Sequence, residues 1–354
     1  MARYNANSAP FITDLLVELS TMGTADTLLG LLSDGHFHSG TDLGEKLGVS
    51  RTSIWKHIKT LDTEYGLDIQ TVSGKGYRLA NAIELLDKER IFSGLDAAAK
   101  KILASFEIKT VLDSTNHYLM QQDVRQSECG HVVLAEMQTA GRGRRGKTWV
   151  SPFAQNIYLS LLWHFDNSAI NLSGVSLAVG VAVINVLQQK GVQDLALKWP
   201  NDIYWQGRKL GGILLELKGE AAGPCSMVVG LGLNVDMSRE AADDIDQAWV
   251  DLNTISQQSN SASLNKISRN NMISELLMEL LPTMQRYAQH GLKPFRSQWQ
   301  QNDMLKDKSV TLLLPQQQRT GIARGIDEQG ALLFESEGKL EAVYAGEVSL
   351  RLQS

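Results

Sequence analysis

The sequence predicts an α+β protein built from three differently patterned segments. Residues 25–82 show helix patterns followed by a short hairpin, and residues 83–305 alternate strand and helix patterns. Residues 306–354 show short strand patterns separated by glycine turns, which is typical of a small all-β domain. The chain has 354 residues and is 43% hydrophobic, so it is long and apolar enough for two or three domains with real cores. Residues 1–24 are expected to form an N-terminal extension, in which residues 11–19 could be a short helix.

The composition restricts the classes of function. A formal net charge of −5 means that any nucleic-acid-binding surface must be local. Cys129 and Cys225 stand far apart without the spacing of a metal site, which favours a reducing compartment over a disulfide framework. No apolar run is long enough to span a membrane, and the N-terminus lacks the pattern of a secretory signal. We therefore expect a cytoplasmic protein that does not associate with membranes.

The first segment predicts a helix-turn-helix. A first helix is expected over residues 27–32. Thr41 is a suitable N-cap for a second helix that stops at Gly48, and Ser50 is a suitable N-cap for a third. Two short helices joined by a glycine-containing turn form the arrangement that places its second helix on DNA.

The third helix separates an apolar face from a polar, basic one. Its apolar residues fall four and three positions apart, as in a stripe that faces a core: Ile54, Ile58 and Leu61. The candidate DNA-binding residues lie toward its N-terminal end: Ser50, Arg51, Thr52, Ser53 and Lys56. Trp55 is unusual for a face that reads bases. It could pack against the first helix, contact a thymine methyl group, or simply be exposed.

A hairpin with a basic tip is expected after this helix. Strand patterns at residues 69–72 and 77–79 flank Ser73-Gly74-Lys75-Gly76, so Lys75 could touch phosphate or the minor groove. The alternative for the whole segment is a small helical bundle for protein contacts, in which the charges are merely solvated. The cations of the third helix together with Lys75 favour DNA binding.

The central segment contains a loop, residues 141–149, with three glycines and four cations: Gly-Arg-Gly-Arg-Arg-Gly-Lys-Thr-Trp. Glycine lets a ligand approach the main chain, and successive N–H groups bind anions. The loop matches the P-loop pattern and the dinucleotide-binding pattern, both of which need a strand before the loop and a helix after it. Residues 132–135 supply the strand, but Pro152 disfavours the helix and residues 157–163 read as another strand. We interpret both matches as coincidences and expect a strand–loop–strand phosphate site.

Further polar groups follow other predicted strands. Residues 113–116 come after a strand pattern at residues 108–112 and could cap a helix or face a ligand. Lys198 and Asp202 lie in a strand interrupted by a proline, where they could be site members or a structural ion pair. Lys209 precedes two glycines, which indicates either a second ligand loop or an ordinary hairpin turn.

The remaining elements follow from periodicity. Helices are expected at residues 175–188 and 272–287, and a glycine-punctuated strand at residues 228–235. A short connector is expected at residues 81–90 and a polar loop around Trp249 at residues 237–262. Four strands of a small barrel are expected at the C-terminal end: residues 309–314, 320–327, 331–335 and 347–352.

The chemistry available to this chain is the neutralisation of an anion. The sequence shows no Ser-His-Asp arrangement, no metal-ligand spacing and no evident pair of acid/base carboxylates. Phosphoryl and nucleotidyl transfer mainly require positioning and charge neutralisation. The cations that could supply these are Arg142, Arg144, Lys147, Lys198 and Lys209. The residues alone indicate a nucleotide-using site attached to a DNA-binding head.

Five ordered motifs resemble those of the biotin protein ligases. They are Asp113-Ser114-Thr115-Asn116 with Gln138, Gly141 to Gly146, Lys198-Trp199-Pro200-Asn201-Asp202, Lys209-Leu210-Gly211-Gly212-Ile213 and Gly230-Leu231-Gly232-Leu233-Asn234. The helix-turn-helix with Gly74-Lys75-Gly76-Tyr77 resembles the bifunctional bacterial type, which is both biotin ligase and biotin operon repressor. The resemblance extends from about residue 25 to the end of the chain.

The resemblance implies three domains and a two-step reaction. The domains would be a winged helix-turn-helix at residues 25–82, a mixed α/β ligase domain of the biotin/lipoate ligase type at residues 83–305, and an SH3-like β-barrel at residues 306–354. Biotin would attack Mg²⁺-ATP to give biotinyl-5′-AMP and pyrophosphate. A lysine of the biotin carboxyl carrier protein of acetyl-CoA carboxylase would then take the biotin and release AMP. The adenylate would also be a corepressor that promotes a homodimer on biotin operator DNA.

The resemblance also implies roles for individual residues. Those around biotin and the adenylate would be Ser114, Thr115, Asn116, Gln138, Arg142, Gly143, Arg144, Lys209, Gly212, Asn234 and Trp249. The catalytic residues would be Lys198, Asp202, Lys209, Arg142 and Arg144. The extension at residues 1–24 and Trp55 depart from the family pattern and leave the operator and the retention of repression open.

Three other functions compete with this interpretation. A lipoate–protein ligase would share the chemistry, but the glycine–arginine loop and the DNA-binding head argue against it. A non-catalytic biotin-responsive repressor could dispense with Lys209. A P-loop ATPase regulator would depend on Lys147, whereas we expect Arg142, Arg144 and Lys209 to matter more.

Overall fold

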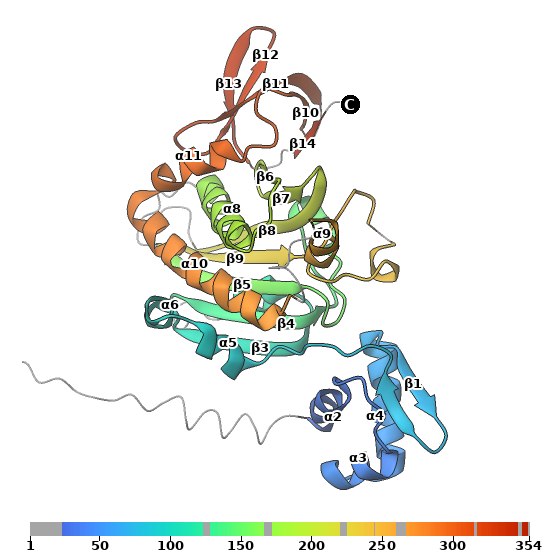
Figure 1. The fold of residues 1–354 in the computed structure, drawn as a ribbon. Helices are drawn as coiled ribbons and strands as arrows, with labels where there is room; N and C mark the ends of the chain where they lie inside the picture. Colours follow the sequence, from blue (N-terminus) through green and yellow to red (C-terminus); the bar gives the residue numbers. More distant parts are fainter. Residues whose placement is uncertain are drawn as a thin grey trace, which may run out of the picture. The chain divides into compact units, whose positions relative to one another are not determined.

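The computed structural model describes residues 23–122, 128–165, 172–219, 225–243, 245–259, 267–314, 317–345 and 349–352. The chain divides into two compact units, with the boundary between Leu85 and Leu86 (Figure 1). The expected extension lies outside the described residues up to position 22, and so does the helix considered at residues 11–19. Within the described ranges, no helix is long and apolar enough to cross a bilayer.

Three helices and a two-stranded hairpin form the first unit. The elements are α2 (Thr24–Leu32), α3 (Gly40–Leu47), α4 (Arg51–Tyr65), β1 (Ile69–Val72) and β2 (Gly76–Leu79). The two strands pair antiparallel. Apolar side chains from all three helices are buried: Leu28, Leu32, Leu43, Ile54, Ile58 and Leu61. The predicted helix-turn-helix, its wing hairpin and the core stripe of the third helix are therefore confirmed.

The prediction that Thr41 caps the second helix is wrong. The Ser39 hydroxyl accepts hydrogen bonds from the backbone N–H groups of Thr41 and Asp42 at 3.2 and 3.5 Å, so α3 begins before Thr41. Serine and threonine are both good N-caps, so the sequence alone does not show whether Ser39 or Thr41 begins the helix. The predicted stop at Gly48, with φ of 66°, and the cap at Ser50 are confirmed.

A seven-stranded mixed sheet forms the centre of the second unit. Its strands are β3 (Ser105–Leu112), β4 (His131–Gln138), β5 (Ile157–Phe165), β6 (Leu195–Lys198), β7 (Asp202–Trp205), β8 (Arg208–Gly219) and β9 (Cys225–Leu233). In space they follow the order β3-β4-β5-β9-β8-β7-β6, with β3 and β4 parallel and the other neighbours antiparallel. This order places the glycine-containing strand β9 beside β5, the strand that follows the glycine–arginine loop, and places β8 next to β9.

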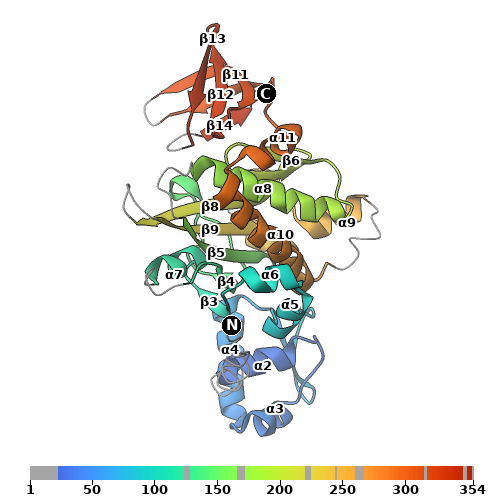
Figure 2. The same ribbon diagram turned by 90° about the vertical axis from the view of Figure 1, so that its left-hand side faces the viewer.

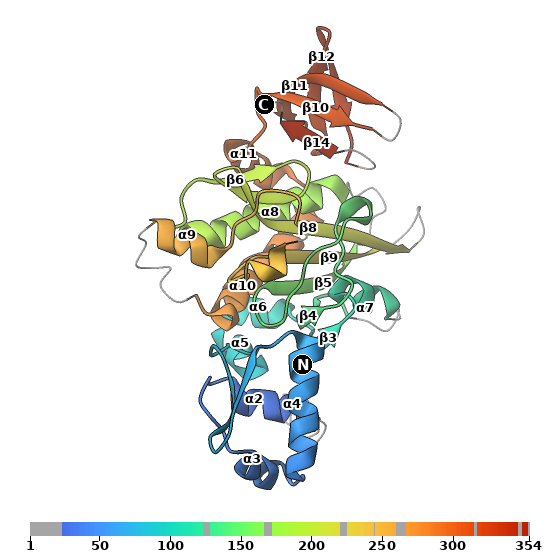
Figure 3. The same ribbon diagram turned by 90° about the vertical axis from the view of Figure 1, so that its right-hand side faces the viewer.

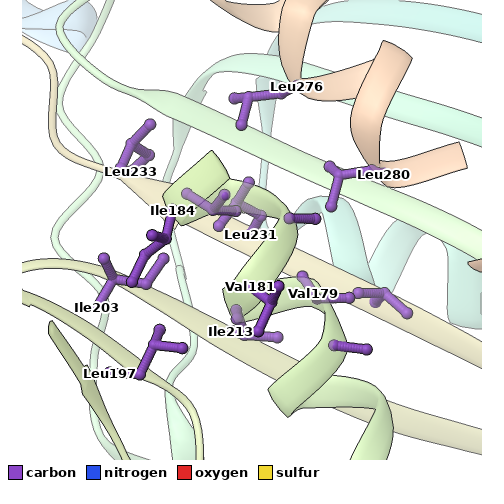
Figure 4. Close-up of a cluster of buried hydrophobic side chains, with 14 of the residues drawn as sticks. Val179, Val181, Ile184, Leu197, Ile203, Ile213, Leu231, Leu233, Leu276 and Leu280 are labelled. Carbon is purple, nitrogen blue, oxygen red and sulfur yellow. The ribbon is translucent and has the colours of Figure 1, made fainter. Parts of the chain in front are cut away.

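Helices cover both faces of the sheet. On one face, α8 (Leu172–Gln189) and α10 (Arg269–His290) lie side by side across the strands (Figure 2). Figure 4 shows the buried side chains of these helices meeting those of the strands. The opposite face is covered by α7 (Thr115–Gln121). The helices predicted at residues 175–188 and 272–287 are confirmed.

The alternation of strand side chains explains this two-sided burial. Val132 and Leu134 of β4 join the core under α8 and α10, whereas Val133 packs against Leu119 of α7. A strand covered on both faces reads as a continuous apolar run in the sequence. That is why residues 132–135 predict a buried strand but do not indicate which helix lies on which side.

Four shorter helices complete the second unit: α5 (Lys88–Gly94), α6 (Ala97–Ile102), α9 (Leu252–Ser259) and α11 (Lys293–Gln301). Two of them begin where the sequence analysis expects a connector or a polar loop. Asp87 caps α5 by accepting from the Arg90 N–H at 2.8 Å, and Asp251 accepts from the Thr254 N–H at 2.7 Å. The connector is confirmed over residues 81–87 and ends where α5 begins, whereas the expected loop was wrong at α9. A helix of eight residues gives little helical periodicity.

The C-terminal strands form a five-stranded antiparallel sheet (Figure 3). They are β10 (Ser309–Leu313), β11 (Gln318–Ile326), β12 (Leu332–Ser336), β13 (Lys339–Val343) and β14 (Ser349–Leu352). Their buried side chains include Val310, Leu312, Ala323, Phe334 and Leu350. The small all-β segment and its four predicted strands are confirmed. The sequence analysis missed β13 because its side chains do not alternate between buried apolar and exposed polar residues. Leu340 is exposed to solvent, whereas the neighbouring Glu341 is half-buried.

Asp303 lies where the chain passes from α11 to the C-terminal sheet. Its two neighbours in the chain, Asn302 and Met304, hydrogen-bond to the backbone of Leu197 at 2.7 and 2.9 Å. The Asp303 oxygen Oδ1 accepts from the Leu305 N–H at 2.9 Å, whereas Oδ2 is buried and has no partner in the described part of the chain. Burial raises the pKa of the Asp303 carboxyl to about 6, against the opposing effect of the Leu305 hydrogen bond.

The substitution Asp303→Asn should stabilise the protein at high pH. An acid whose pKa rises on folding leaves stability intact below its unfolded pKa, about 3.9, and lowers stability as the pH rises through the folded value. We expect the melting temperature of the variant to exceed that of the unaltered protein at pH 8 but not at pH 4, as measured by calorimetry. An equal difference at the two pH values would contradict this account.

Candidate functional site

A cavity of about 900 Å³ lies in the second unit. Its walls are the start of α7, the glycine–arginine loop, the turn between β6 and β7, strands β8 and β9, and the edge of the C-terminal sheet at Leu313 and Leu350. Most of the residues predicted for the ligand site line it: Ser114, Thr115, Asn116, Gln138, Arg142, Gly143, Arg144, Lys198, Asp202, Lys209 and Gly212. Segments from distant parts of the sequence therefore share one cavity.

The glycine–arginine loop folds back on itself between two strands. Gly143 N–H donates to the Lys147 carbonyl at 2.7 Å, and Trp149 N–H donates to the Gly141 carbonyl at 2.9 Å. Arg145 and Gly146 have φ of 59° and 69°, which tightens the turn. Residues 139–156 are all described, and the only helical element among them is a single 3₁₀ turn, Arg144–Gly146. The strand–loop–strand prediction is confirmed, and both literal motif matches are coincidences.

The polar residues at the start of α7 cap the helix and also line the cavity. The Ser114 hydroxyl accepts from the His117 N–H at 3.4 Å, and Gln138 Oε1 accepts from the Thr115 N–H at 2.9 Å. Ser160 Oγ lies 2.7 Å from Thr115 Oγ1 and 2.6 Å from Asn116 Oδ1. The single Ser160 proton serves one of these acceptors at a time, so the cluster can rearrange its donors when a polar ligand arrives.

The floor of the cavity is made of glycines. A Cβ atom at Gly230 would lie less than 3.0 Å from the Asn116 side chain, and one at Gly232 would meet the Trp149 ring at a similarly forbidden distance. At Gly212 a Cβ would press on the same ring at 3.3 Å. The missing side chains let Asn116 and Trp149 rest directly on the backbone of β8 and β9.

The cations of the cavity are held by internal acceptors. Lys209 Nζ lies 2.8 Å from Asp202 Oδ1 and 5.4 Å from the centre of the Trp149 ring. Arg142 Nη1 is 3.5 Å from Glu216 Oε1. Of the alternatives for Lys209, the structure places it in the cavity, paired with Asp202.

Arg144 is half-buried. Its guanidinium donates to Asn201 Oδ1 at 3.4 Å and to the carbonyl of Ala345, which follows β13. Burial lowers the pKa of Arg144, while the nearby Asp202 carboxylate raises it. Lys198, the backbone partner of Asp202 across the β6–β7 hairpin, has its Nζ 5.3 Å from the centre of the Tyr204 ring.

Two predicted site residues do not line the cavity. Asn234 is buried and donates through Nδ2 to the Val250 carbonyl at 3.1 Å. Trp249 lies in a short segment that bridges to Lys209: Lys209 N–H donates to the Ala248 carbonyl, and Val250 N–H donates to the Lys209 carbonyl, each at 2.9 Å. Both residues thus hold the backbone that carries Lys209.

Sequence reasoning did not single out Trp149 as a site residue. Its ring lines the cavity, and its Nε1 is buried without a hydrogen-bond partner among the described residues. A signal was present: a tryptophan closes the glycine–cation loop, and the paired glycines of β8 and β9 leave room for a large ring. The cavity also includes Tyr158, Asn201, Tyr204, Gly230 and Gly232.

The candidate DNA-binding residues of the first unit lie on one surface of α4 and on the wing. Arg51, Thr52 and Lys56 are exposed, while Ser53 is half-buried and donates its N–H to the cap at Ser50. Trp55 is 52% exposed, so it does not pack into the helical core. In the wing, Lys75 Nζ lies 5.7 Å from the centre of the Phe37 ring.

Family models match all three segments. The model of the Biotin/lipoate A/B protein ligase family matches residues 108–234, an HTH domain model matches residues 25–78, and the Biotin protein ligase C terminal domain model matches residues 307–351. The bifunctional ligase/repressor BirA of Salmonella typhimurium is 42% identical over 325 residues, which cover 92% of this chain and 97% of the relative. The chain belongs to this family of bifunctional ligase/repressor proteins.

Other relatives agree with this assignment. The bifunctional ligase/repressor BirA of Escherichia coli is 40% identical over 324 residues, or 92% of this chain and 96% of the relative. Among solved structures, the biotin protein ligase from Aquifex aeolicus in complex with biotin and ATP is similar with a TM-score of 0.61 and 27% identity. The match covers 71% of this chain and 100% of the Aquifex aeolicus chain. The α+β fold with a helix-turn-helix, a ligase domain and a C-terminal sheet is therefore confirmed.

The substitution Gly230→Ala should disrupt the polar cluster. The added methyl group would displace Asn116, which also donates to Glu216 Oε2 at 2.8 Å. We expect a loss of about 1–3 kcal/mol in the free energy of unfolding, measured by urea denaturation. Gly143→Ala is the matched control, because its Cβ would meet only ordinary contacts at 3.4 Å and beyond. Equal stability of the two variants would show that Asn116 does not depend on this glycine.

Proposed function

We propose that this protein activates biotin with ATP to biotinyl-5′-AMP and transfers the biotin to a lysine of the biotin carboxyl carrier protein of acetyl-CoA carboxylase. The observation that carries this proposal is that one cavity combines a cluster of neutral hydrogen-bonding side chains with Arg142, Arg144 and Lys209. The polar head group of an acid such as biotin needs the neutral hydrogen-bonding groups, and the phosphate of ATP needs the cations. Adenylation brings the two substrates together, so both sets of residues must line the same cavity. The 42% identity to a bifunctional ligase/repressor supports the same activity.

The neutral cluster fits the ureido head of biotin. Thr115, Asn116, Gln138 and Ser160 supply hydroxyl and amide groups that can both donate and accept. Apolar pockets with a few placed polar groups are typical of small-ligand sites. We assign Ser114 to the same end of the cavity, because it caps the helix that presents Thr115 and Asn116.

The cations stabilise the adenylation step. A carboxylate oxygen of biotin attacks the α-phosphorus of ATP, and the bond to pyrophosphate breaks. Negative charge accumulates on the phosphoryl oxygens, where Lys209 and Arg144 can donate hydrogen bonds. Asp202 orients Lys209 through the 2.8 Å ion pair. Arg142 belongs to the glycine–arginine loop and lines the same cavity. Asn234 and Trp249 act indirectly by fixing the backbone at Lys209.

The transfer step needs protection from water. An acceptor lysine attacks the carbonyl carbon of the mixed anhydride, and AMP leaves with the bonding electron pair. Trp149, at the end of the glycine–arginine loop, lies over Gly212, and the loop with Gly143 can cover the anhydride until the lysine arrives. We assign adenine stacking to Trp149, which lines the cavity. Lys198 is assigned to the phosphate side of the site because it adjoins Asp202 across the hairpin.

Magnesium is part of the ATP substrate in this proposal. Mg²⁺ usually keeps several waters and is bound by one or two carboxylates together with substrate phosphates. Asp202 and Asp246 are carboxylates that line the cavity and fit this role. The metal would neutralise charge on the pyrophosphate leaving group.

The first unit would act as a repressor with biotinyl-5′-AMP as corepressor. We propose that the adenylate promotes a homodimer whose two helix-turn-helix units bind biotin operator DNA through Ser50, Arg51, Thr52, Ser53, Lys56 and Lys75. Dimers of such units commonly bind palindromic half-sites. We retain the domain boundaries after residues 24, 82 and 305 as part of this proposal.

Pyrophosphate exchange into ATP should depend on biotin. We expect exchange with biotin and none with lipoate or without an acid, because only an acid that fits the cluster can form the acyl adenylate. Exchange with lipoate instead would show that the substrate is lipoate and not biotin. Tight binding of biotin without exchange would indicate a non-catalytic repressor. In the same assay, Lys209→Ala should lower the rate about 100-fold.

The matched control for that variant is Lys147→Ala. Lys147 is an exposed cation of the glycine–arginine loop that also lines the cavity. Its substitution should affect exchange by no more than a few-fold, because Lys147 lies outside the Asp202–Lys209 pair. A larger loss for Lys147→Ala than for Lys209→Ala would favour a P-loop-type ATPase.

Adenylate should control DNA binding. In a gel-shift titration with biotin operator DNA, we expect the full-length protein to bind more tightly with biotin and ATP than without them. The concentration dependence of the shift should steepen, because dimerisation and DNA binding are coupled. A shift of equal affinity with and without adenylate would overturn the corepressor role and leave ligation unaffected.

A further inference from the structure

Two exposed apolar side chains stand out in the first unit. Among its described residues, the exposed large hydrophobic side chains are Trp55 and Val72, at 52% and 39% exposure. Trp55 belongs to α4 and Val72 to β1 of the wing. Both therefore lie on the elements proposed to contact DNA, and a partner that covers these elements would remove both from water.

The surroundings of Trp55 indicate the chemistry of that partner. Residues three and four positions apart share a helix face, so Arg51, Thr52 and Lys59 flank Trp55, and all three are exposed. Lys59 Nζ lies 5.7 Å from the centre of the indole ring, close enough for a cation–π contact that orients the ring. An apolar protein surface on this face would have to bury these cations, which is unfavourable without matching anions.

DNA offers both kinds of contact at once. Its phosphates neutralise the flanking cations, and its major groove presents an apolar group at each thymine, the 5-methyl. Recognition helices direct residues of their N-terminal turns toward base edges. Trp55 is the fifth residue of α4 and sits in its second turn, so it is within that part of the helix.

We propose that Trp55 reads thymine in the major groove by packing its indole against the 5-methyl group. This inference rests on the DNA-binding function proposed above and adds a specificity-determining residue to it. Arg51, Lys56 and Lys75 position the protein on phosphates, and Trp55 selects sequence. The exposure of Trp55 excludes packing against the first helix. Between a thymine contact and simple exposure, the flanking cations favour the thymine contact.

Uracil scanning tests the proposal directly. The probe is DNA enriched from a random library by the full-length protein with biotin and ATP. Replacing one thymine by deoxyuridine removes a methyl group and leaves every hydrogen-bonding group in place. For the unaltered protein we expect one or two positions per half-site at which this change weakens binding about fourfold, the effect of one buried methyl group.

Trp55→Ala should abolish this sensitivity. We expect it to weaken binding to the thymine-containing probe about tenfold and to show no further loss at the same uracil positions. Trp55→Phe keeps an aromatic ring and should retain part of the methyl effect. Circular dichroism and thermal unfolding of both variants show whether the first unit remains folded.

Lys75→Ala is the control for a phosphate contact. It should weaken binding to all probes alike, reduce the slope of log affinity against log salt by about one, and keep the uracil-sensitive positions. If the unaltered protein enriches no DNA, the DNA-binding function fails and the inference with it. If the unaltered protein binds and Trp55→Ala or Trp55→Phe keeps the full uracil effect, the inference alone is overturned.

Discussion

Asn116 and Trp149 rest directly on the backbone of β9, because Gly230 and Gly232 have no side chains to hold them away. The positions of these two side chains, and of the groups that they contact, depend on this close approach. Asn116 connects the Thr115–Gln138–Ser160 cluster to Glu216 of β8, and the Trp149 ring supports Lys209. A methyl group added at Gly230 would displace Asn116, and one added at Gly232 would displace the Trp149 ring.

The cations are pre-positioned by partners that the protein itself supplies. Asp202 pairs with Lys209, Glu216 with Arg142, and Asn201 with Arg144, so each cation has an internal partner in the structure. Asn201 is fixed in turn by donating to the Ile213 carbonyl at 2.7 Å. The cations of the cavity thus come from strand β8, which carries Lys209, as well as from the glycine–arginine loop, and this distinguishes the cavity from a P-loop.

The sequence predicts the site better than it predicts the details of the fold. Residues 114–116 and Lys209 were assigned to the site because their motifs resemble those of the biotin protein ligases, and all four residues line the cavity. Trp149 was missed because its role depends on glycines more than 60 residues away in strands that only the fold brings near. Asn234 was predicted at the ligand but acts through Val250, since a motif shows membership of a site and not the direction of a side chain. Short capped helices such as α9 escaped because eight residues do not establish a period.

The contact between Arg144 and the Ala345 carbonyl links the glycine–arginine loop to the segment that follows β13. A guanidinium that turns toward a phosphate gives up that carbonyl, and a half-buried carbonyl without a donor is unfavourable. A phosphate bound in the cavity would therefore compete with Ala345 for this donor. A protein shortened at residue 305 would lose both this carbonyl and the part of the cavity wall that Leu313 and Leu350 supply.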